Sequence, residues 1–419
     1  MNLTTPPHRF DVDPDDIHAE YERRDCAALS DEQVFDLAAE VVSIPKQEPA
    51  SSFILHAPLE LLARRALLRG VAPDRRAAVR ERILWVAATY ERAAEAVEPA
   101  PHRTYDAPAA ARAAIAAATA AQDLDGVDAA ARWLGRNAST DDVMALSPSI
   151  LDSLAAAGHA SIYFFHLSRT AAHSRAALAL LRPLAREVAR YPQLRIEWID
   201  GGVDAHSADA DRFADALGRT PRLGLPGSDF IFPTVHQVDS GGHARAIVGE
   251  LLPSDLTAAS NAILRVAAAS MLQDDTVYAP YGWTHCLTLP QAVLGITPWL
   301  PDPVVAAATA ATYVVGFRAA EGALDVDLAW EPPRTSTALP DALTGDPATA
   351  ASAAYHADDA ALAALVPELA ARAGAHEDAH LAKYTLACFD AAYRDPAQRR
   401  LYLAAAASLS AWWKAPAPG

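Results

Sequence analysis

Alanine-rich stretches with larger apolar residues at helical spacing run through most of this 419-residue chain. Alanine is the strongest helix former, so segments such as 109–121 and 350–373 are expected to be helices. Proline-rich connectors at 98–108 and 325–349 separate such stretches. Residues 194–199 alternate in polarity like a short strand, but a strand needs a pairing partner and none is evident. The pattern predicts an all-α fold.

The distribution of polar and breaker residues suggests the domain plan. Residues 1–25 are polar and acidic and are expected to be a flexible N-terminal arm, and 414–419 a disordered tail. Between them, 26–413 is expected to form a single helical domain with a metal site in the helix-bundle core. Residues 200–245 are rich in Gly, Asp and Pro, which predicts an irregular loop or lid insert with one short helix near Asp209–Leu217.

The best-defined helix start in the sequence is at Ser30. It is followed by Asp31 and Glu32, and a serine cap with acidic first-turn residues is typical of a helix N-terminus. The helix is expected to run to about Val42.

Charge and cysteine usage exclude several classes of protein. The chain has 35 Lys and Arg against 52 Asp and Glu, a net charge of −17, so neither nucleic acid nor an anionic membrane is an expected partner. The three cysteines, Cys26, Cys286 and Cys388, have no paired spacing, which favours a reducing compartment. Charged residues interrupt the long apolar runs and no signal peptide is evident, so a cytoplasmic protein is expected. The oligomeric state is left open, with a homodimer as one option.

Most nucleotide and hydrolase motifs are absent from the sequence. It has no G-x-G-x-x-G after a strand, no P-loop, no G-x-S-x-G and no C-x-x-C. Residues 376–380, however, read His-Glu-Asp-Ala-His and match H-E-x-x-H. On one continuous helix, His376, His380 and Lys383 would project from one side, and a zincin would use Glu377 to activate water. No glutamate follows Glu377 as a third ligand, so a zinc hydrolase is kept as an alternative.

Further histidines occur in apolar helical contexts far apart in the chain. His56 and His285 are two of these, while His159, His166 and His173 are spaced by sevens and share a face if their helix is continuous. Each alone could be an ordinary hydrogen-bonded core histidine. Together they fit the way helix bundles assemble metal sites from separate helices, although imidazole suits Fe, Zn, Cu and Ni alike.

Four short stretches carry a family resemblance: Leu-His-Ala-Pro-Leu-Glu-Leu-Leu at 55–62, Leu-Ala-Ala-Ala-Gly-His-Ala at 154–160, Thr-His-Cys-Leu-Thr-Leu-Pro at 284–290 and His-Leu-Ala-Lys at 380–383. In this order they resemble the questin oxidase-like family. The family includes oxygenases that open the ring of anthraquinones and related aromatic polyketides, compounds of secondary metabolism.

The resemblance implies a mononuclear non-haem iron site. His56, His159, His285 and His380 would be its imidazole ligands, and Lys383, carboxylated on its side-chain nitrogen, would be the fifth. A free ammonium cannot bind a metal, whereas its carbamate is an anionic oxygen donor. A lysine desolvated among apolar residues loses its proton more easily, so its neutral amine can react with carbon dioxide.

The chain is therefore expected to be an Fe(II)-dependent oxygenase that uses O2 on a bulky aromatic small molecule. Six aromatic residues are candidates for its apolar pocket: Tyr163, Phe164, Phe165, Tyr281, Trp283 and Tyr384. His166 and His376 remain open as substitute ligands. Zinc is the alternative metal, and a non-enzymatic helical binding protein with core histidines is the alternative from another class.

Overall fold

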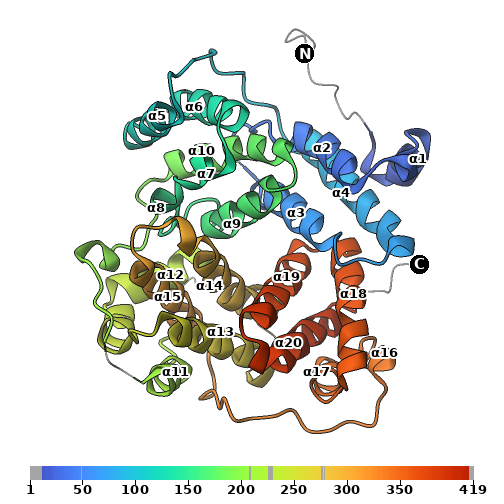
Figure 1. The fold of residues 1–419 in the computed structure, drawn as a ribbon, viewed down its shortest axis with the longest axis vertical. Helices are drawn as coiled ribbons and strands as arrows, with labels where there is room; N and C mark the ends of the chain where they lie inside the picture. Colours follow the sequence, from blue (N-terminus) through green and yellow to red (C-terminus); the bar gives the residue numbers. More distant parts are fainter. Residues whose placement is uncertain are drawn as a thin grey trace. The chain divides into compact units, whose positions relative to one another are not determined.

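The computed structural model describes residues 12–48, 50–206, 209–224, 230–274, 277 and 279–414 (Figure 1). Every regular element in these ranges is a helix, and extended backbone is paired there at isolated bridges alone, for example Lys46 with Ala96 and His206 with Pro253. The predicted all-α class is confirmed. The suggested strand at 194–199 does not form, and a 3-10 helix begins at Trp198 instead.

The helices gather into two compact units, one ending at Leu194 and the other beginning at Arg195. The sequence suggested a single domain over 26–413. The contacts between helices separate this range into the two units. Each unit is described by itself.

The first unit is built from helices that pack in sequence-distant pairs, including α2 with α4 and α3 with α9. Its helices are α1 (Ile17–Arg23), α2 (Asp31–Val42), α3 (Ser52–Leu67), α4 (Arg76–Ala93), α5 (Pro108–Ala120), α6 (Leu124–Asn137), α7 (Thr140–Met144), α8 (Ser147–Ile150), α9 (Ala160–Ala171) and α10 (Leu181–Arg190). Helix α1 packs against α4, so the described part of the expected flexible arm is helical.

Helix α2 begins as the sequence indicated. The Ser30 hydroxyl accepts from the Gln33 backbone N–H at 3.2 Å, and the Gln33 side chain accepts from the Ser30 N–H at 2.8 Å. This capping box satisfies two N–H groups that the helix itself leaves without acceptors. Val34, Phe35 and Ala38 then lie buried on one face against α4, which fixes the helix in the unit.

The second unit contains α11 (Ala210–Gly218), α12 (Ile231–Ser240), α13 (Leu256–Gln273), α14 (Thr284–Ile296), α15 (Pro303–Glu321), α16 (Leu339–Ala342), α17 (Pro347–Tyr355), α18 (Asp359–Ala375), α19 (Ala379–Arg394) and α20 (Arg399–Trp412). Two short π-helices, η6 (Arg245–Gly249) and η8 (Ala279–Trp283), lie between them. Segment 200–245 was expected to be irregular apart from one short helix near Asp209–Leu217. Helix α11 confirms that short helix, whereas α12 was not expected. Their amphipathic faces bury Phe213, Leu217 and Val235, and this packing outweighs the Gly- and Asp-rich composition.

Helix α15 lies in the core of the second unit, where α12, α13 and α14 pack on it. By length and composition it is the one described helix that could cross a membrane, with a mean hydropathy of 1.3. However, 83% of that window is buried inside the protein. Such burial is what the core helix of a soluble domain shows, and it explains why the helix is apolar on all sides.

Candidate metal-binding histidines

Two of the predicted ligands, His56 and His159, lie together in the first unit. His56 is in the second turn of α3, which the Ser51 side chain caps, and His159 is the residue before α9. Because α3 packs on α9, the two imidazoles meet edge to face, with ring centroids 4.4 Å apart and an interplanar angle of 71°. His159 is only 3% exposed.

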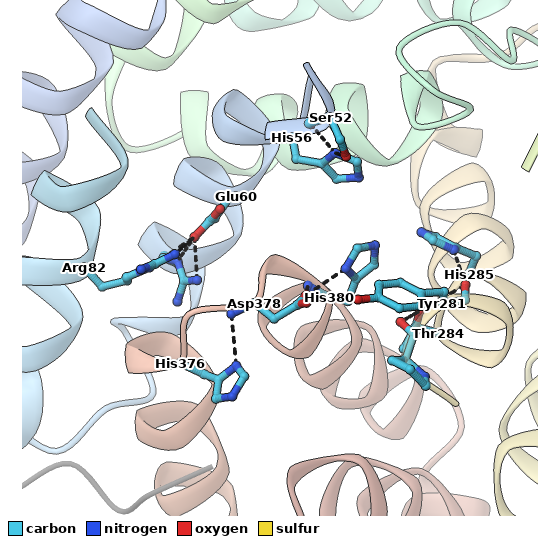
Figure 2. Close-up of polar contacts among 12 residues, drawn as sticks. Ser52, His56, Glu60, Arg82, Tyr281, Thr284, His285, His376, Asp378 and His380 are labelled. Atoms are coloured by element: carbon cyan, nitrogen blue, oxygen red, sulfur yellow. Dashed lines mark hydrogen bonds and ion pairs between the residues drawn. The ribbon is translucent and has the colours of Figure 1, made fainter. Parts of the chain in front are cut away.

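The Nδ1 atom of each imidazole in this pair bonds to a backbone carbonyl. The His56 Nδ1 lies 2.6 Å from the Ser52 carbonyl oxygen, with the Ser52 hydroxyl further away at 3.4 Å (Figure 2). The His159 Nδ1 lies 2.9 Å from the carbonyl oxygen of Ala157. A carbonyl can only accept, so Nδ1 carries the proton in both rings and Nε2 carries the lone pair. The Nε2 lone pair is the one a metal would use.

The backbone just before His159 adopts an uncommon conformation. Ala156, Ala157 and Gly158 have φ angles of 51°, 54° and 83°, all in the left-handed region. Glycine tolerates this region, whereas an L-residue with a Cβ pays roughly 1 kcal/mol there. This turn directs the Ala157 carbonyl toward the His159 ring, and strained backbone of this kind is typically found at functional sites.

We expect Ala157→Gly to raise the free energy of unfolding by about 0.5–1 kcal/mol, because glycine relieves the left-handed strain. The Ala157 side chain is exposed, so little burial is lost. Chemical denaturation measures the change. The control is Ala145→Gly, an exposed alanine with φ −64°, where added backbone freedom should lower stability by a few tenths of a kcal/mol. Equal destabilisation by both changes would contradict the assignment of strain.

The other two predicted imidazole ligands, His285 and His380, lie together in the second unit. Each is the second residue of its helix, α14 or α19, and these helices pack against each other. Their ring centroids are 5.0 Å apart with an interplanar angle of 84°. The Tyr281 ring lies 5.1 Å from the His380 ring and nearly perpendicular to it (Figure 2).

The same Nδ1 arrangement recurs in this second pair. The His285 Nδ1 bonds to the Tyr281 carbonyl, which the π-helix η8 brings one turn below it. The His380 Nδ1 lies 2.8 Å from the Asp378 Oδ1, and that same oxygen accepts from the His380 backbone N–H at 2.7 Å as the cap of α19. A carboxylate behind an imidazole orients the ring and makes its Nε2 more basic, as outer partners of metal-bound histidines do.

The H-E-x-x-H interpretation is wrong, because the motif is not helical. Helix α18 ends at Ala375, His376 has extended backbone with ψ 149°, and Asp378 caps the next helix. His376 and His380 are therefore not one turn apart on one helix. The His376 Nδ1 accepts from the Asp378 N–H at 3.0 Å, and its ring lies 5.7 Å from that of Trp413. Residues 376–380 therefore lack the single-helix geometry that a zincin uses.

Lys383 and His166 are both deeply buried. Lys383 follows His380 by three residues on α19, so the two share a side of that helix as predicted, and it is 1% exposed. His166 is 2% exposed in α9, with its ring 5.3 Å from that of Phe165. The shared face suggested for His159, His166 and His173 does not form, because α9 spans only Ala160–Ala171.

The six candidate pocket aromatics separate into different environments. Tyr281 is 56% exposed and lies beside His380. Partial burial, reinforced by the Asp378 carboxylate, raises the pKa of its phenol, which therefore stays neutral at physiological pH. Tyr163 is a core residue whose hydroxyl donates to the Leu180 carbonyl at 2.6 Å, while Phe164, Trp283 and Tyr384 are fully buried.

Cys286 follows His285 directly and is also buried. Burial raises the pKa of its thiol to about 12. It is therefore a thiol at neutral pH.

No family model, curated protein or solved structure matches this chain. The candidate ligands therefore stand on their own local geometry: two histidines in each unit, whose Nδ1 atoms all bond to an oxygen of their own helix or turn. The sequence pointed to the histidines but gave no sign of the shared Nδ1 pattern, which depends on backbone geometry.

Proposed function

We propose that the chain is an iron-dependent oxygenase of the cytoplasm that uses O2 to oxidise or cleave a bulky aromatic molecule of polyketide type. The observation that supports it best is the Nδ1 pattern. His56, His159, His285 and His380 each direct the Nδ1–H to an oxygen acceptor, so each offers Nε2 to a metal. Core histidines with no such role have no reason to share one tautomer.

The donor set fits iron(II). Neutral imidazole nitrogens bind several divalent metals, and one anionic oxygen among them favours iron over softer ions. The buried Lys383, as its carbamate, would supply that oxygen from the helix that carries His380. The assignment of all five residues to one iron comes from the family resemblance. When bound, iron(II) supplies the redox chemistry that activates dioxygen.

The residues of the chain would position the ligands and the substrate. The carbonyls of Ser52, Ala157 and Tyr281 and the carboxylate of Asp378 fix the imidazole orientations. The exposed ring of Tyr281 beside His380 offers an aromatic surface on which a planar substrate can stack, and such aromatic contacts favour offset or edge-to-face geometry.

The test is elemental analysis of protein purified without a nickel column. We expect about one iron per chain in the wild type and almost none in either His56→Ala or His380→Ala, because removing one imidazole weakens a metal site by orders of magnitude. His236→Ala is the control, since this exposed histidine of α12 stacks on Phe232 and should keep the iron content unchanged.

The outcomes distinguish the alternatives. Equal loss in both variants supports one ion held by all the ligands, whereas partial loss in each would contradict the single-ion assignment. No metal in the wild type after anaerobic incubation with iron(II) would contradict the oxygenase and leave a helical binding protein with structural histidines. Iron-loaded protein is then assayed for oxygen consumption with anthraquinones and related aromatic polyketides.

A further inference from the structure

A cavity of about 330 Å³ lies within the second unit, where four helix ends meet. It is formed by the first residues of α13 and α15 and the last residues of α14 and α19, which Figure 1 labels. Its polar lining includes Ser260, Asn261 and Arg394, and its apolar lining includes Leu256, Leu294 and Pro298. This volume is in the range of small-molecule pockets, about 300–1,000 Å³.

The cavity is distinct from the histidine pair of the same unit. His285 and His380 lie in the first turns of α14 and α19, whereas Leu294 and Arg394 lie near the other ends of those helices. At 1.5 Å per residue, the separation is roughly 14 Å along α14 and roughly 21 Å along α19. A molecule in the cavity is therefore beyond contact with either imidazole.

Arg394 supplies the positive charge of the cavity. Its Nη2 donates to the Leu294 carbonyl at 3.1 Å, and no carboxylate of the described residues forms an ion pair with it. The adjacent Asp395 is already engaged, since it accepts two bonds from Arg265, at 2.6 and 2.9 Å, and one from Tyr402. Desolvation lowers the pKa of Arg394, against the weaker opposite effect of Asp390. Its guanidinium thus has N–H donors available for an anion.

Asn261 and Ser260 supply acceptors in the lining of the cavity. The Asn261 Oδ1 is buried, and no described donor bonds to it. The Ser260 hydroxyl donates to the Leu256 carbonyl at 2.6 Å, so its oxygen is left as an acceptor. A buried acceptor without a donor is unfavourable, and a ligand hydroxyl or amine would satisfy it.

We propose that this cavity binds a small organic acid that carries a hydroxyl next to its carboxylate and an apolar body. The carboxylate would accept paired N–H bonds from Arg394, a geometry that guanidinium favours. The hydroxyl would donate to the Asn261 Oδ1. The apolar body would pack on Leu256, Leu294 and Pro298.

The experiment is isothermal titration calorimetry with three aromatic probes that differ in one group each. Mandelate has the carboxylate, the hydroxyl and a phenyl ring; phenylacetate lacks the hydroxyl; in 1-phenyl-1,2-ethanediol a CH2OH group replaces the carboxylate. We expect mandelate to bind most tightly, phenylacetate less tightly, and the diol not measurably. No heat of binding from mandelate at about 10 mM would overturn the proposal.

Variants assign the binding to this cavity. Arg394→Gln should weaken mandelate binding about tenfold or more, because a hydrogen-bonded charge is lost. Arg399→Gln, a nearby exposed arginine outside the lining, should leave it unchanged. Asn261→Ala should lower the affinity for mandelate to that for phenylacetate, with the unfolding temperature retained. If Arg394→Gln binds mandelate as well as the wild type, the cavity is not the site. None of these readouts depends on iron.

Discussion

Replacing Arg318 with leucine should lower the midpoint of thermal unfolding by roughly 10 °C, because it leaves a buried carboxylate without its cation. Arg318 and Asp274 form an ion pair at 3.1 Å inside the second unit, and both side chains are 1% exposed. Removing one partner of such a pair costs about 3–5 kcal/mol. That is a large part of the stability of an ordinary domain, about 5–15 kcal/mol.

The surroundings of the pair explain why the loss should be large. The Arg318 guanidinium also donates to the Gly218 carbonyl at 3.0 Å, to the Leu324 carbonyl and to the Ser270 hydroxyl at 3.3 Å. Asp274 accepts from the backbone N–H of Ala323 at 3.1 Å. The guanidinium therefore ties the end of α11 and the segment after α15 to α13, and leucine would remove its hydrogen bonds to both carbonyls.

The controls separate burial from charge. Arg219 forms an ion pair with Asp215 at 2.8 Å, and the two side chains are 63% and 53% exposed. Arg219→Leu removes this pair and should lower the free energy of unfolding by at most about 0.5 kcal/mol. The double change Arg318→Leu with Asp274→Leu should be less destabilising than the sum of the two single changes, because no uncompensated charge remains. Equal shifts for Arg318→Leu and Arg219→Leu would contradict the argument.

This network also supports the start of α14. The Arg318 guanidinium lies over the Trp283 ring, 5.7 Å from its centroid, and Trp283 ends the π-helix that places the Tyr281 carbonyl behind His285. Loosening the network should therefore release the imidazole orientation as well. A π-helix at this point is in keeping with the frequent occurrence of such bulges at functional sites.

The fold class could be predicted from sequence because it depends on local properties. Alanine-rich composition and helical spacing indicated helices, and Ser30 with Gln33 set the start of α2 at the expected residue. Segment 200–245 was harder. The short helix near 209–217 was indicated by the sequence, whereas α12 exists through packing of Val235 rather than through intrinsic propensity. The division at Leu194 depends on contacts between distant helices, which no local pattern contains.

The sequence predicted which histidines are candidate ligands, but it did not predict the backbone conformation around them. Histidines among apolar residues were visible in the sequence, and the pairs His56 with His159 and His285 with His380 form within their units. The H-E-x-x-H pattern misled because Asp378 prefers the cap of a helix to its interior, and the chain breaks there. The left-handed turn at Ala156 and Ala157 had no sequence sign, since alanine rarely adopts it.

Asp378→Asn should weaken iron binding about 10–100-fold while leaving the fold intact, if the proposed iron site is correct. Asp378 has two roles on one oxygen: it caps α19 through the His380 N–H, and it holds the His380 Nδ1–H. Asparagine caps a helix as well as aspartate does, so the first role is kept. Its amide is uncharged, so the second role is weakened: the imidazole becomes less basic and its orientation less fixed.

Competition with a chelator of known affinity measures the iron dissociation constant, and thermal unfolding of the iron-free protein measures the fold. The matched control is Asp346→Asn, which also removes the charge of a helix cap. Asp346 caps α17, where its side chain accepts from the Thr349 N–H at 2.9 Å and holds no imidazole. A purely structural Asp378 would give the same result as Asp346 in both measurements. A change confined to iron affinity, and to Asp378, means that the carboxylate acts through the His380 ring as a positioning residue. In that case, the functional feature of residues 376–380 is the pair of the Asp378 carboxylate and the His380 imidazole. The H-E-x-x-H pattern that overlaps this pair has no role.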